Sequence, residues 1–420
     1  MNPAFAPGLF RHPPVSDSTA SRPHLILFAL WLMMFSASSQ LIIMVPLLPE
    51  IEATLGVNAF WQGMLLTAYA LSLGVSALLT GPLSDRIGRR RILLLGTLLL
   101  SVTLALHTVA ADYELLLGMR LLAGIGGGML SGGSVAYVGD YFPYERRGWA
   151  NGWVMTGTAM GQIAGVPIGK VLGASFGYRW PFVLFAITMA GAFVLIWQFV
   201  PRPDVDLDPR RLTPRRVVQK YRTVLQGSPV AAAVGAYFLM FAGFGLFASF
   251  LPTWLEGVIG LSGYEVALLF AIGGVANVLA APSAGHLSDG IGRKPLVVGA
   301  SALLAGLVFI APYTIAGFWS AAFLFFLAMA GVGIRIGPLQ SLLTALVPDS
   351  RRGLLMGLAM SIGQAGFGIG SFIASSTYAF YGYASNTLLG TLVTVGMAVL
   401  VHRGLPEPHL GTRPSPADAS

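Results

Sequence analysis

The chain has 420 residues, of which 55% are hydrophobic and only 10% are charged. A soluble protein of this length needs many more charged side chains on its surface, whereas a chain embedded in lipid does not. The formal net charge of +8 would suit nucleic-acid binding, but the cations are divided among many loops instead of lying on one face. Without cysteine, disulfides, thiolate metal sites and cysteine nucleophiles are excluded.

Residues 1–24 contain several prolines and no apolar run, which predicts a disordered tail. Beyond them, apolar runs are long enough to span a bilayer, which takes about 20 residues. The twelve predicted spans are 25–48, 60–82, 91–110, 114–140, 149–174, 180–200, 229–251, 264–285, 294–314, 317–346, 353–375 and 384–402. Because lipid offers no partner for backbone groups and no barrel-like alternation is present, the sequence predicts an all-α integral membrane protein.

The basic residues give the orientation. Of the 25 Lys and Arg, 21 fall in the two tails and in the loops after even-numbered spans. Cytoplasmic loops carry the excess of positive charge, so both termini are predicted to be cytoplasmic. We expect a multi-pass protein of the cell (cytoplasmic or inner) membrane. The first apolar run is too long for a signal peptide and lacks a cleavage site, so we expect it to be retained.

An internal repeat divides the chain into two halves. The stretch Gly81–Arg91 (GPLSDRIGRRR) returns 204 residues later as Gly285–Lys294 (GHLSDGIGRK), each between two apolar runs. Arg146-Arg147-Gly148 likewise returns as Arg351-Arg352-Gly353, and Gly177-Tyr178 as Gly382-Tyr383. The repeat predicts two six-helix halves, 25–201 and 229–403.

The linker at 202–228 joins these halves, and 404–420 is expected to be a disordered cytoplasmic tail. Within the linker, Thr213 and Pro214 suit the start of a short helix, followed by an apolar face that includes Val217 and Tyr221. A helix of this kind would lie on the anionic inner leaflet. A solvated linker is the alternative.

The motifs resemble those of the major facilitator superfamily over nearly all of residues 25–403. Asp85–Arg91 matches the family's signature between helices 2 and 3, and Pro46-Leu-Leu-Pro49 resembles the proline pair that ends helix 1. Arg120-x-x-x-Gly124-x-Gly126 resembles the helix 4 signature. The helix 5 signature of proton-driven exporters is resembled by Gly161, Gly165, Pro167 and Gly169. There the proline lies one residue late, and Lys170 stands where a further glycine is common.

The resemblance implies twelve helices in two halves that rock about a central site. The nearest group is the twelve-helix drug:proton antiporters, which include sugar exporters. The family also implies a gating latch at the helix 2–3 loop, in which Asp85 faces helix 11 near Gly353 and Arg89 pairs with Asp140.

Physical chemistry supports this latch. Gly88 and Gly292 permit a tight reversal of the chain, and an acid such as Asp85 is stabilised near a helix N-terminus. The second copy holds Ala345 where the first has Asp140, so we expect the first copy to be the stronger latch. The predicted latch residues are Gly81, Asp85, Arg86, Gly88, Arg89, Asp140, Asp289, Gly292 and Arg293. The alternative is that these charges only anchor the topology.

No acid falls in the middle of a span, so the candidates for coupling are few. Arg120 in span 4 matches the family's arginine to which proton-coupling roles are assigned. Alternatively, it bonds to backbone carbonyls or to Asp112 and Glu114. Helix 1 carries Gln40 instead of an acid, and Gln does not titrate. Glu50 at the outer end of that helix is therefore the second coupling candidate, or it is simply solvated; Asp140, His107 in the third span and the substrate itself are the alternatives.

A cation inside the bilayer is costly and normally faces a partner or a wet cavity. Arg335 in span 10 would thus hold a substrate carboxylate or phosphate, or reach towards the cytoplasm. The aromatic and polar side chains of the spans supply the remaining candidates for a substrate cavity. They are Phe35, Gln40, Tyr69, Tyr237, Phe241, Asn277, Gln340 and Gln364, some of which would serve only as helix contacts.

The sequence therefore predicts a secondary transporter that exports small amphipathic compounds or sugars in exchange for protons. An organic-anion or metabolite transporter that uses Arg335 is the alternative, and a sensor or scaffold without flux is a remote one. We expect no enzyme, metal or cofactor, because no nucleophile–base pair, metal cluster or nucleotide loop is present. The expected partners are a small-molecule substrate, protons and the lipid bilayer, but no nucleic acid. A monomer is expected, since one chain supplies both halves.

Overall fold

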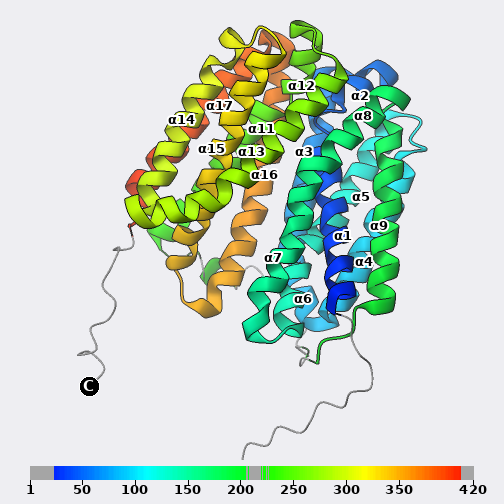
Figure 1. Cartoon of the computed structure of the whole chain (residues 1–420), viewed down its shortest axis with the longest axis vertical. Helices are drawn as coiled ribbons and strands as arrows, with labels where there is room; N and C mark the ends of the chain where they lie inside the picture. Colours follow the sequence, from blue (N-terminus) through cyan, green and yellow to red (C-terminus); the bar gives the residue numbers. More distant parts are fainter. Residues whose placement is uncertain are drawn as a thin grey trace, which may run out of the picture.

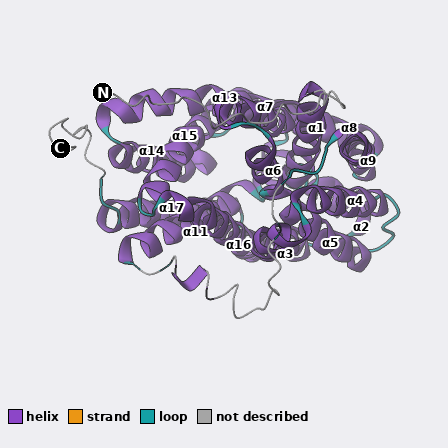
Figure 2. Cartoon of the chain, turned by 90° about the horizontal axis from the view of Figure 1, so that it is seen from below, coloured by secondary structure: helices purple, strands orange, loops and turns teal. Residues whose placement is uncertain are grey.

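The computed structural model describes residues 23–204, 207, 219, 221–223, 225 and 227–407, apart from the side chains of residues 289, 349 and 350. Every regular element within these residues is a helix. Figure 1 shows two bundles side by side, and Figure 2 shows the same two groups of helices from below. The all-α prediction is confirmed.

The first bundle holds the N-terminal half. Its elements are α1 (Pro23–Ile42), α2 (Leu48–Leu55), α3 (Ala59–Ile87), α4 (Arg89–His107), α5 (Tyr113–Ser131), α6 (Gly133–Tyr141), α7 (Tyr144–Met160), η1 (Gly161–Gly165), α8 (Val166–Phe176) and α9 (Arg179–Phe199). The second bundle holds α11 (Ser228–Ala248), α12 (Leu251–Trp254), η2 (Leu255–Ile259), α13 (Gly263–Ile291), α14 (Arg293–Thr314), α15 (Phe318–Ala345), α16 (Asp349–Tyr381) and α17 (Tyr383–Gly404).

Within the described chain, eleven helical segments are long and apolar enough to cross a membrane. Each coincides with one of the predicted spans. The remaining predicted span, 149–174, is occupied by α7, η1 and α8 in succession, which do not meet that criterion as one helix. The count of twelve and the cytoplasmic placement of the termini stay predictions.

Prolines and π-helical turns interrupt the long helices at the points where the backbone bends. Helix α1 ends at Ile42 and α2 begins at Leu48; Pro46 lies in this break, and Pro49 lies in the first turn of α2. Pro167 sits at the start of α8, and the π-turn η1 precedes it. Because proline lacks an N–H and its ring crowds the preceding turn, a helix absorbs it by widening or bending there. The π-turn η1 lies in the turn before Pro167, where this crowding acts.

Two glycines make the repeated turns between long helices. Gly88 separates α3 from α4 with φ +94°, and Gly292 separates α13 from α14 with the same φ. An L side chain is strained at such a φ, and glycine is not. The matching geometry confirms that both copies of the loop motif form the same tight reversal. We call the end of the molecule that holds these turns the motif end, and the opposite one the Glu50 end.

The two bundles pack against each other mainly through α3 with α16 and through α8 with α13. A Cβ added at Gly74 of α3 would lie 2.9 Å from the carbonyl oxygen of Ser361 in α16. Thr67 of α3 donates to the carbonyl of Gly368, at 2.9 Å. These helices thus touch backbone to backbone along their middle sections.

Contacts between the halves are recorded at the Glu50 end as well as at mid-depth. Near the Glu50 end, an added Cβ at Gly63 would overlap Ser375 of the other half, and one at Gly263 would lie 2.9 Å from Ala174. At the motif end, an added Cβ at Gly81 or at Gly353 meets nothing within 4 Å. Figure 1 shows α2 and α12 together at the top of the molecule, while α6 and α7 stand apart from the other bundle below.

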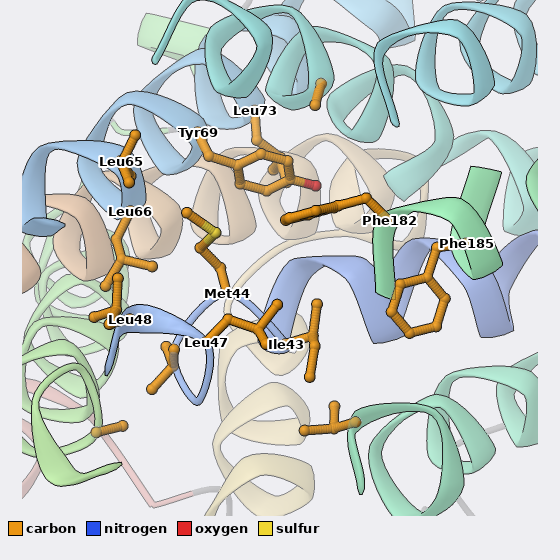
Figure 3. Packing of buried hydrophobic residues seen from close by; sticks show 14 of the residues in the cluster. Ile43, Met44, Leu47, Leu48, Leu65, Leu66, Tyr69, Leu73, Phe182 and Phe185 are labelled. Carbon is orange, nitrogen blue, oxygen red and sulfur yellow. The ribbon is translucent and has the colours of Figure 1, made fainter. Parts of the chain in front are cut away.

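The core of the first bundle forms around the break between α1 and α2. Figure 3 shows Ile43, Met44 and Leu47 of this turn among side chains of α3 and α9, including Leu65 and Phe182. All five are buried. Packing therefore fixes the geometry of the break between α1 and α2. It also fixes the position of Glu50 on α2, at the Glu50 end of the molecule.

Two predicted boundaries need correction. Helix α1 begins at Pro23, inside the predicted tail 1–24. At the other end, Leu405 is buried and Glu407 accepts from the backbone N–H groups of Arg293 and Lys294. The prediction of disorder from 404 onwards is therefore wrong for 404–407, because a carboxylate at the N-terminus of α14 is a favourable contact. The rest of both tails and most of the predicted linker helix lie outside the described residues.

Candidate functional site

A buried polar group brings together three of the residues that the sequence singled out. Gln40 of α1 donates from Nε2 to the hydroxyl of Tyr69 in α3, at 2.6 Å. Arg120 of α5 reaches the Gln40 Oε1 from Nη1 at 3.5 Å, and its guanidinium carbon lies 4.1 Å from the centre of the Tyr69 ring. All three side chains are buried. We call Gln40, Tyr69 and Arg120 the Arg120 cluster.

The Arg120 cluster lies inside the bundle, since Arg120 is seven residues into α5, or about 10 Å along its axis. Among the described residues, no carboxylate forms an ion pair with it. Asp112, one of the two acids considered as its partner, instead caps α5 by accepting from Leu115 N at 2.8 Å. A buried cation held only by a ring face and an amide is poised to interact with an anion or to respond to a nearby charge.

The second bundle carries a comparable group on α11 and α15. Tyr237 stacks on Phe241 with ring centres 6.2 Å apart. The Tyr237 hydroxyl interacts electrostatically with the Gln340 side chain, but no hydrogen bond of regular geometry joins it to any partner. The structure therefore brings these three predicted cavity residues together.

Arg335 is the most unusual cation of this half. It is only 2% exposed, and no hydrogen-bond partner meets its Nε or Nη1. It lies ten residues before the end of α15, or about 15 Å from the motif end. A buried guanidinium with two nitrogens that meet no partner among the described residues is costly, which makes this position a candidate site for an anionic ligand.

The remaining predicted cavity residues are scattered. Phe35 stacks on Trp31 along α1, with ring centres 5.6 Å apart. Asn277 packs its backbone against Gly333, within the second half. Gln364 of α16 lies beside Gly74 of α3, at the contact between the halves. The structure thus assigns these side chains mainly to packing, apart from Gln364.

The helix 5 glycines also serve packing. An added Cβ at Gly161 would lie 2.9 Å from the carbonyl of Phe35, and one at Gly169 would lie 2.9 Å from Ile43. At Gly165 it would overlap the hydroxyl of Ser39. The ladder therefore lets α1 run close against η1 and α8.

The latch of the first repeat is assembled within one half. Arg89 pairs with Asp85 at 2.6 Å and with Asp140 at 2.9 Å, and it also donates to Ser84. The pair with Asp140 is the contact that the family resemblance implies. The contact from Asp85 to α16 near Gly353, which the family resemblance also implies, stays a prediction. Arg86 is exposed beside it.

The linker touches this latch. Tyr221 donates to the carbonyl of Leu78 in α3, at 2.9 Å. Burial raises the pKa of Tyr221, and the nearby Asp85 carboxylate raises it further. The hydroxyl therefore stays protonated at neutral pH and remains a donor, so the linker is attached to α3 next to the latch.

The second copy is built differently. Glu407 bonds to the N-terminus of α14 at 2.9 Å on both Arg293 N and Lys294 N, and the Lys294 ammonium donates to the carbonyl of Leu405. The side chain of Asp289 lies outside the described residues. The two copies of the loop thus bond to different partners. In the first copy, Arg89 pairs with an acid of its own bundle, whereas in the second the N-terminus of α14 bonds to the C-terminal segment of the chain.

We predict that Asp85→Asn lowers transport roughly fivefold, at the low end of typical coupling energies. The amide removes the charge that pairs with Arg89 and that would face α16 when the motif end closes. The measurement is initial transport rate in vesicles at equal protein amount. Asp289→Asn is the matched control in the second copy, for which we expect less than half of the loss. Unchanged transport by Asp85→Asn would contradict the latch.

An ion-pair group that the sequence did not predict occupies the Glu50 end. The Lys170 ammonium lies 2.6 Å from Glu50 Oε1 and 2.6 Å from Glu256 Oε1. The first contact is a hydrogen bond, whereas the second is an ion pair without hydrogen-bond geometry. We call Glu50, Lys170 and Glu256 the acid–lysine triad. The Lys170 side chain is fully buried.

Comparison with known proteins agrees with this architecture. A family model described as Major Facilitator Superfamily matches residues 28–282 and 233–419. Multidrug resistance protein MdtG of Serratia proteamaculans (strain 568) is 27% identical over 392 residues, covering 89% of this chain and 92% of that protein. The uncharacterized MFS-type transporter YwfA of Bacillus subtilis (strain 168) is 24% identical over 380 residues, covering 89% and 90%.

Two solved structures share the fold. A D-xylose–proton symporter superposes with a TM-score of 0.74 at 19% identity, covering 93% of this chain and 99% of that one. The human organic anion transporter MFSD10 (TETRAN) superposes with a TM-score of 0.71 at 17% identity, covering 90% and 99%. At such identities the likeness concerns the arrangement of helices.

Proposed function

We propose that this chain, which belongs to the Major Facilitator Superfamily and is a multi-pass membrane transporter, exports small amphipathic compounds in exchange for protons. Sugars are the second class of compound that we include. The matched family and relatives are transporters and not enzymes. In the predicted topology the motif end is cytoplasmic and the Glu50 end is external.

The observation that carries this proposal is the difference between the two ends. At the Glu50 end α8 contacts α13 and α2 contacts α12, whereas α6 and α7 stand apart from the other bundle at the motif end (Figure 1). A transporter that alternates between two openings has one end closed at a time. We interpret this arrangement as the state that receives its substrate from the cytoplasm.

Each half also presents a polar group inside its bundle. The Arg120 cluster belongs to the first half, and Tyr237, Gln340 and Arg335 belong to the second. A site shared by two halves is where rocking changes the exposure of a ligand from one side to the other. Aromatic faces such as those of Tyr69 and Phe241 suit amphipathic ligands, since they offer apolar area next to polar atoms.

Proton exchange is supported by a charge argument. The Arg120 cluster contains no titrating acid, so a proton that drives exchange must bind elsewhere or on the substrate. Glu50 belongs to the acid–lysine triad at the Glu50 end, so this coupling candidate has Lys170 as a partner and its side chain is partly buried. The multidrug resistance protein MdtG among the relatives favours export of amphipathic compounds.

The experiment is an exchange assay in proteoliposomes with an imposed pH gradient. Candidate amphipathic compounds and sugars are loaded while internal pH is recorded with a trapped dye. We expect substrate flux in one direction to be accompanied by proton flux in the other. Flux that is indifferent to the gradient would contradict proton exchange, although not transport as such.

A second candidate function is transport of an organic anion. The specific observation in its favour is Arg335, which is buried and lacks a partner at Nε and Nη1. A carboxylate or phosphate of the substrate would complete these donors.

We predict that Arg335→Gln separates these candidates. If the substrate is an anion held by this guanidinium, its transport falls about tenfold or more, because a charge-assisted bond contributes about 1.5–3 kcal/mol. Transport of cationic or neutral compounds stays within twofold. Initial rates for a matched set of anionic, neutral and cationic substrates give the answer. Equal effects on all three would remove the anion role.

A further inference from the structure

The acid–lysine triad bridges the two halves. Glu50 lies on α2 and Lys170 on α8, both in the first half, whereas Glu256 lies on η2 in the second half. The Lys170 ammonium meets an oxygen of each carboxylate at 2.6 Å. One fully buried cation is thus shared between acids that rocking of the halves would separate.

The internal repeat explains why two acids converge here. Pro46-x-x-x-Glu50 and Pro252-x-x-x-Glu256 have the same spacing and lie 206 residues apart. In the structure both prolines lie close to a helix break and both acids lie on the helical segment that follows. The two halves therefore present equivalent carboxylates at the same end of the molecule.

The lysine has no such twin. With the offset of 205 residues that relates helix 5 to helix 11, Lys170 corresponds to Ser375, which packs against Gly63. Lys170 is also the residue that departs from the helix 5 signature. The single cation is consequently a feature of this chain, and it sits where the repeat brings two acids together.

The charges of the triad do not balance. Two carboxylates face one ammonium, and both acids are about four-fifths buried, with 17% of the Glu50 side chain and 20% of the Glu256 side chain exposed. One negative charge is left over in a largely desolvated place. Two carboxylates that share a site do not both stay ionised as readily as one, so the second takes up a proton more readily than an isolated carboxylate as the pH falls.

We propose that the acid–lysine triad is an ionic lock between the halves at the Glu50 end, and that Glu256 is its proton-binding group. A proton from the solution at that end adds to a Glu256 oxygen and removes its attraction to Lys170, while Lys170 stays paired with Glu50. The two halves are then free to separate at this end. The lock gives the proton of the proposed exchange a binding site. It rests on the proposed function only for this link between proton binding and exchange.

The other titratable groups around the triad are already paired. Glu52 of α2 accepts from the Gln62 amide at 2.8 Å. At the start of α13, Tyr264 bonds to Ser175, and Glu265 forms the capping box with Ser262. Arg179, after α8, donates to the carbonyl of Ala110. The charged groups that act on Glu256 are Lys170 and Glu50, so a pH effect on the lock is traced to the members of the triad.

The test is a distance measurement across the Glu50 end. The chain has no native cysteine, so spin labels are introduced at Val109 and Tyr313, which are exposed at that end in opposite halves. Double electron–electron resonance is recorded in lipid nanodiscs at pH 7.5 and pH 5, without substrate. We expect the wild-type lock to favour the short distance at pH 7.5 and to shift towards the long one at pH 5.

In Glu256→Gln, we expect the ratio of long to short distances at pH 7.5 to rise about fivefold, and its pH dependence to disappear. Glu52→Gln is the matched control, because it neutralises an acid on the same helix as Glu50 whose hydrogen bond is to Gln62 and not to the triad. It is expected to match the wild type. Identical distributions for Glu256→Gln and wild type at both pH values would overturn the lock.

A second comparison keeps the proposal testable if Glu256→Gln does not fold. Lys170→Glu alone should open the end, and Lys170→Glu combined with Glu256→Lys should restore the short distance, because two acids again share one cation. No restoration would overturn the lock. A wild-type distribution that does not change with pH would overturn the proton-binding role. Since no substrate is present, these outcomes are independent of the flux assay that tests proton exchange.

Discussion

Arg120→Met should lower proton-driven exchange roughly 100-fold, near the upper end of known coupling energies. Arg120 is the cation that joins Gln40 and Tyr69 inside the first bundle. Methionine fills a similar volume without charge, and an apolar replacement of a buried charge is often neutral for stability. We therefore expect Arg120→Met to fold but to lose the electrostatic coupling between substrate binding and proton binding.

The readout must separate coupling from binding. We expect substrate–substrate counterflow, which needs no net proton movement, to remain within about tenfold of the wild type. Tyr69→Phe is the matched control, because it keeps the ring beneath the guanidinium but removes the hydroxyl that Gln40 bonds. Its loss should be only a few-fold. Proton-driven exchange by Arg120→Met within twofold of the wild type would contradict the role of this residue.

Gly74→Leu should lower exchange roughly 50-fold, since overpacking costs about 1–3 kcal/mol and here meets backbone. Even the first side-chain atom at this position would lie 2.9 Å from the Ser361 carbonyl in the other half. The contact between α3 and α16 would have to widen along its length. The contact between α3 and α16, about which we expect the halves to rock, would then be displaced.

Gly118→Leu is the control for this substitution. Gly118 lies inside α5, and an added Cβ there meets nothing within 4 Å. We expect this variant to transport within twofold of the wild type and to elute alike in size-exclusion chromatography. If Gly74→Leu transported equally well, the close contact between α3 and α16 would not be part of the moving interface.

The sequence could predict features that repeat or that lie close in the chain. The glycine turns at Gly88 and Gly292 follow from a motif that occurs twice. The pairing of Arg89 with Asp140 came from the family resemblance, since 51 residues separate them. Helix boundaries were close because lipid demands long apolar runs, yet the buried segment at Leu405 and Glu407 was missed, since its partner is the distant α14.

The acid–lysine triad shows why part of the site stayed hidden. Glu50 was a coupling candidate, but its partners are 120 and 206 residues away in the sequence. Single residues at span ends ordinarily reach water, so burial of Lys170 required knowing which helices pack around it. The repeated spacing Pro-x-x-x-Glu was the available signal, because equivalent acids in two related halves meet near the axis between them.

The central claim is that the two halves rock as units, so that opening of one end accompanies closure of the other. Paired labels test it in one preparation: Val109 with Tyr313 across the Glu50 end, and Tyr144 with Ile291 across the motif end, all of them exposed. On a change of pH or addition of a transported compound, the account predicts that one distance lengthens while the other shortens. Two distances that stay fixed, or that lengthen together, would contradict it.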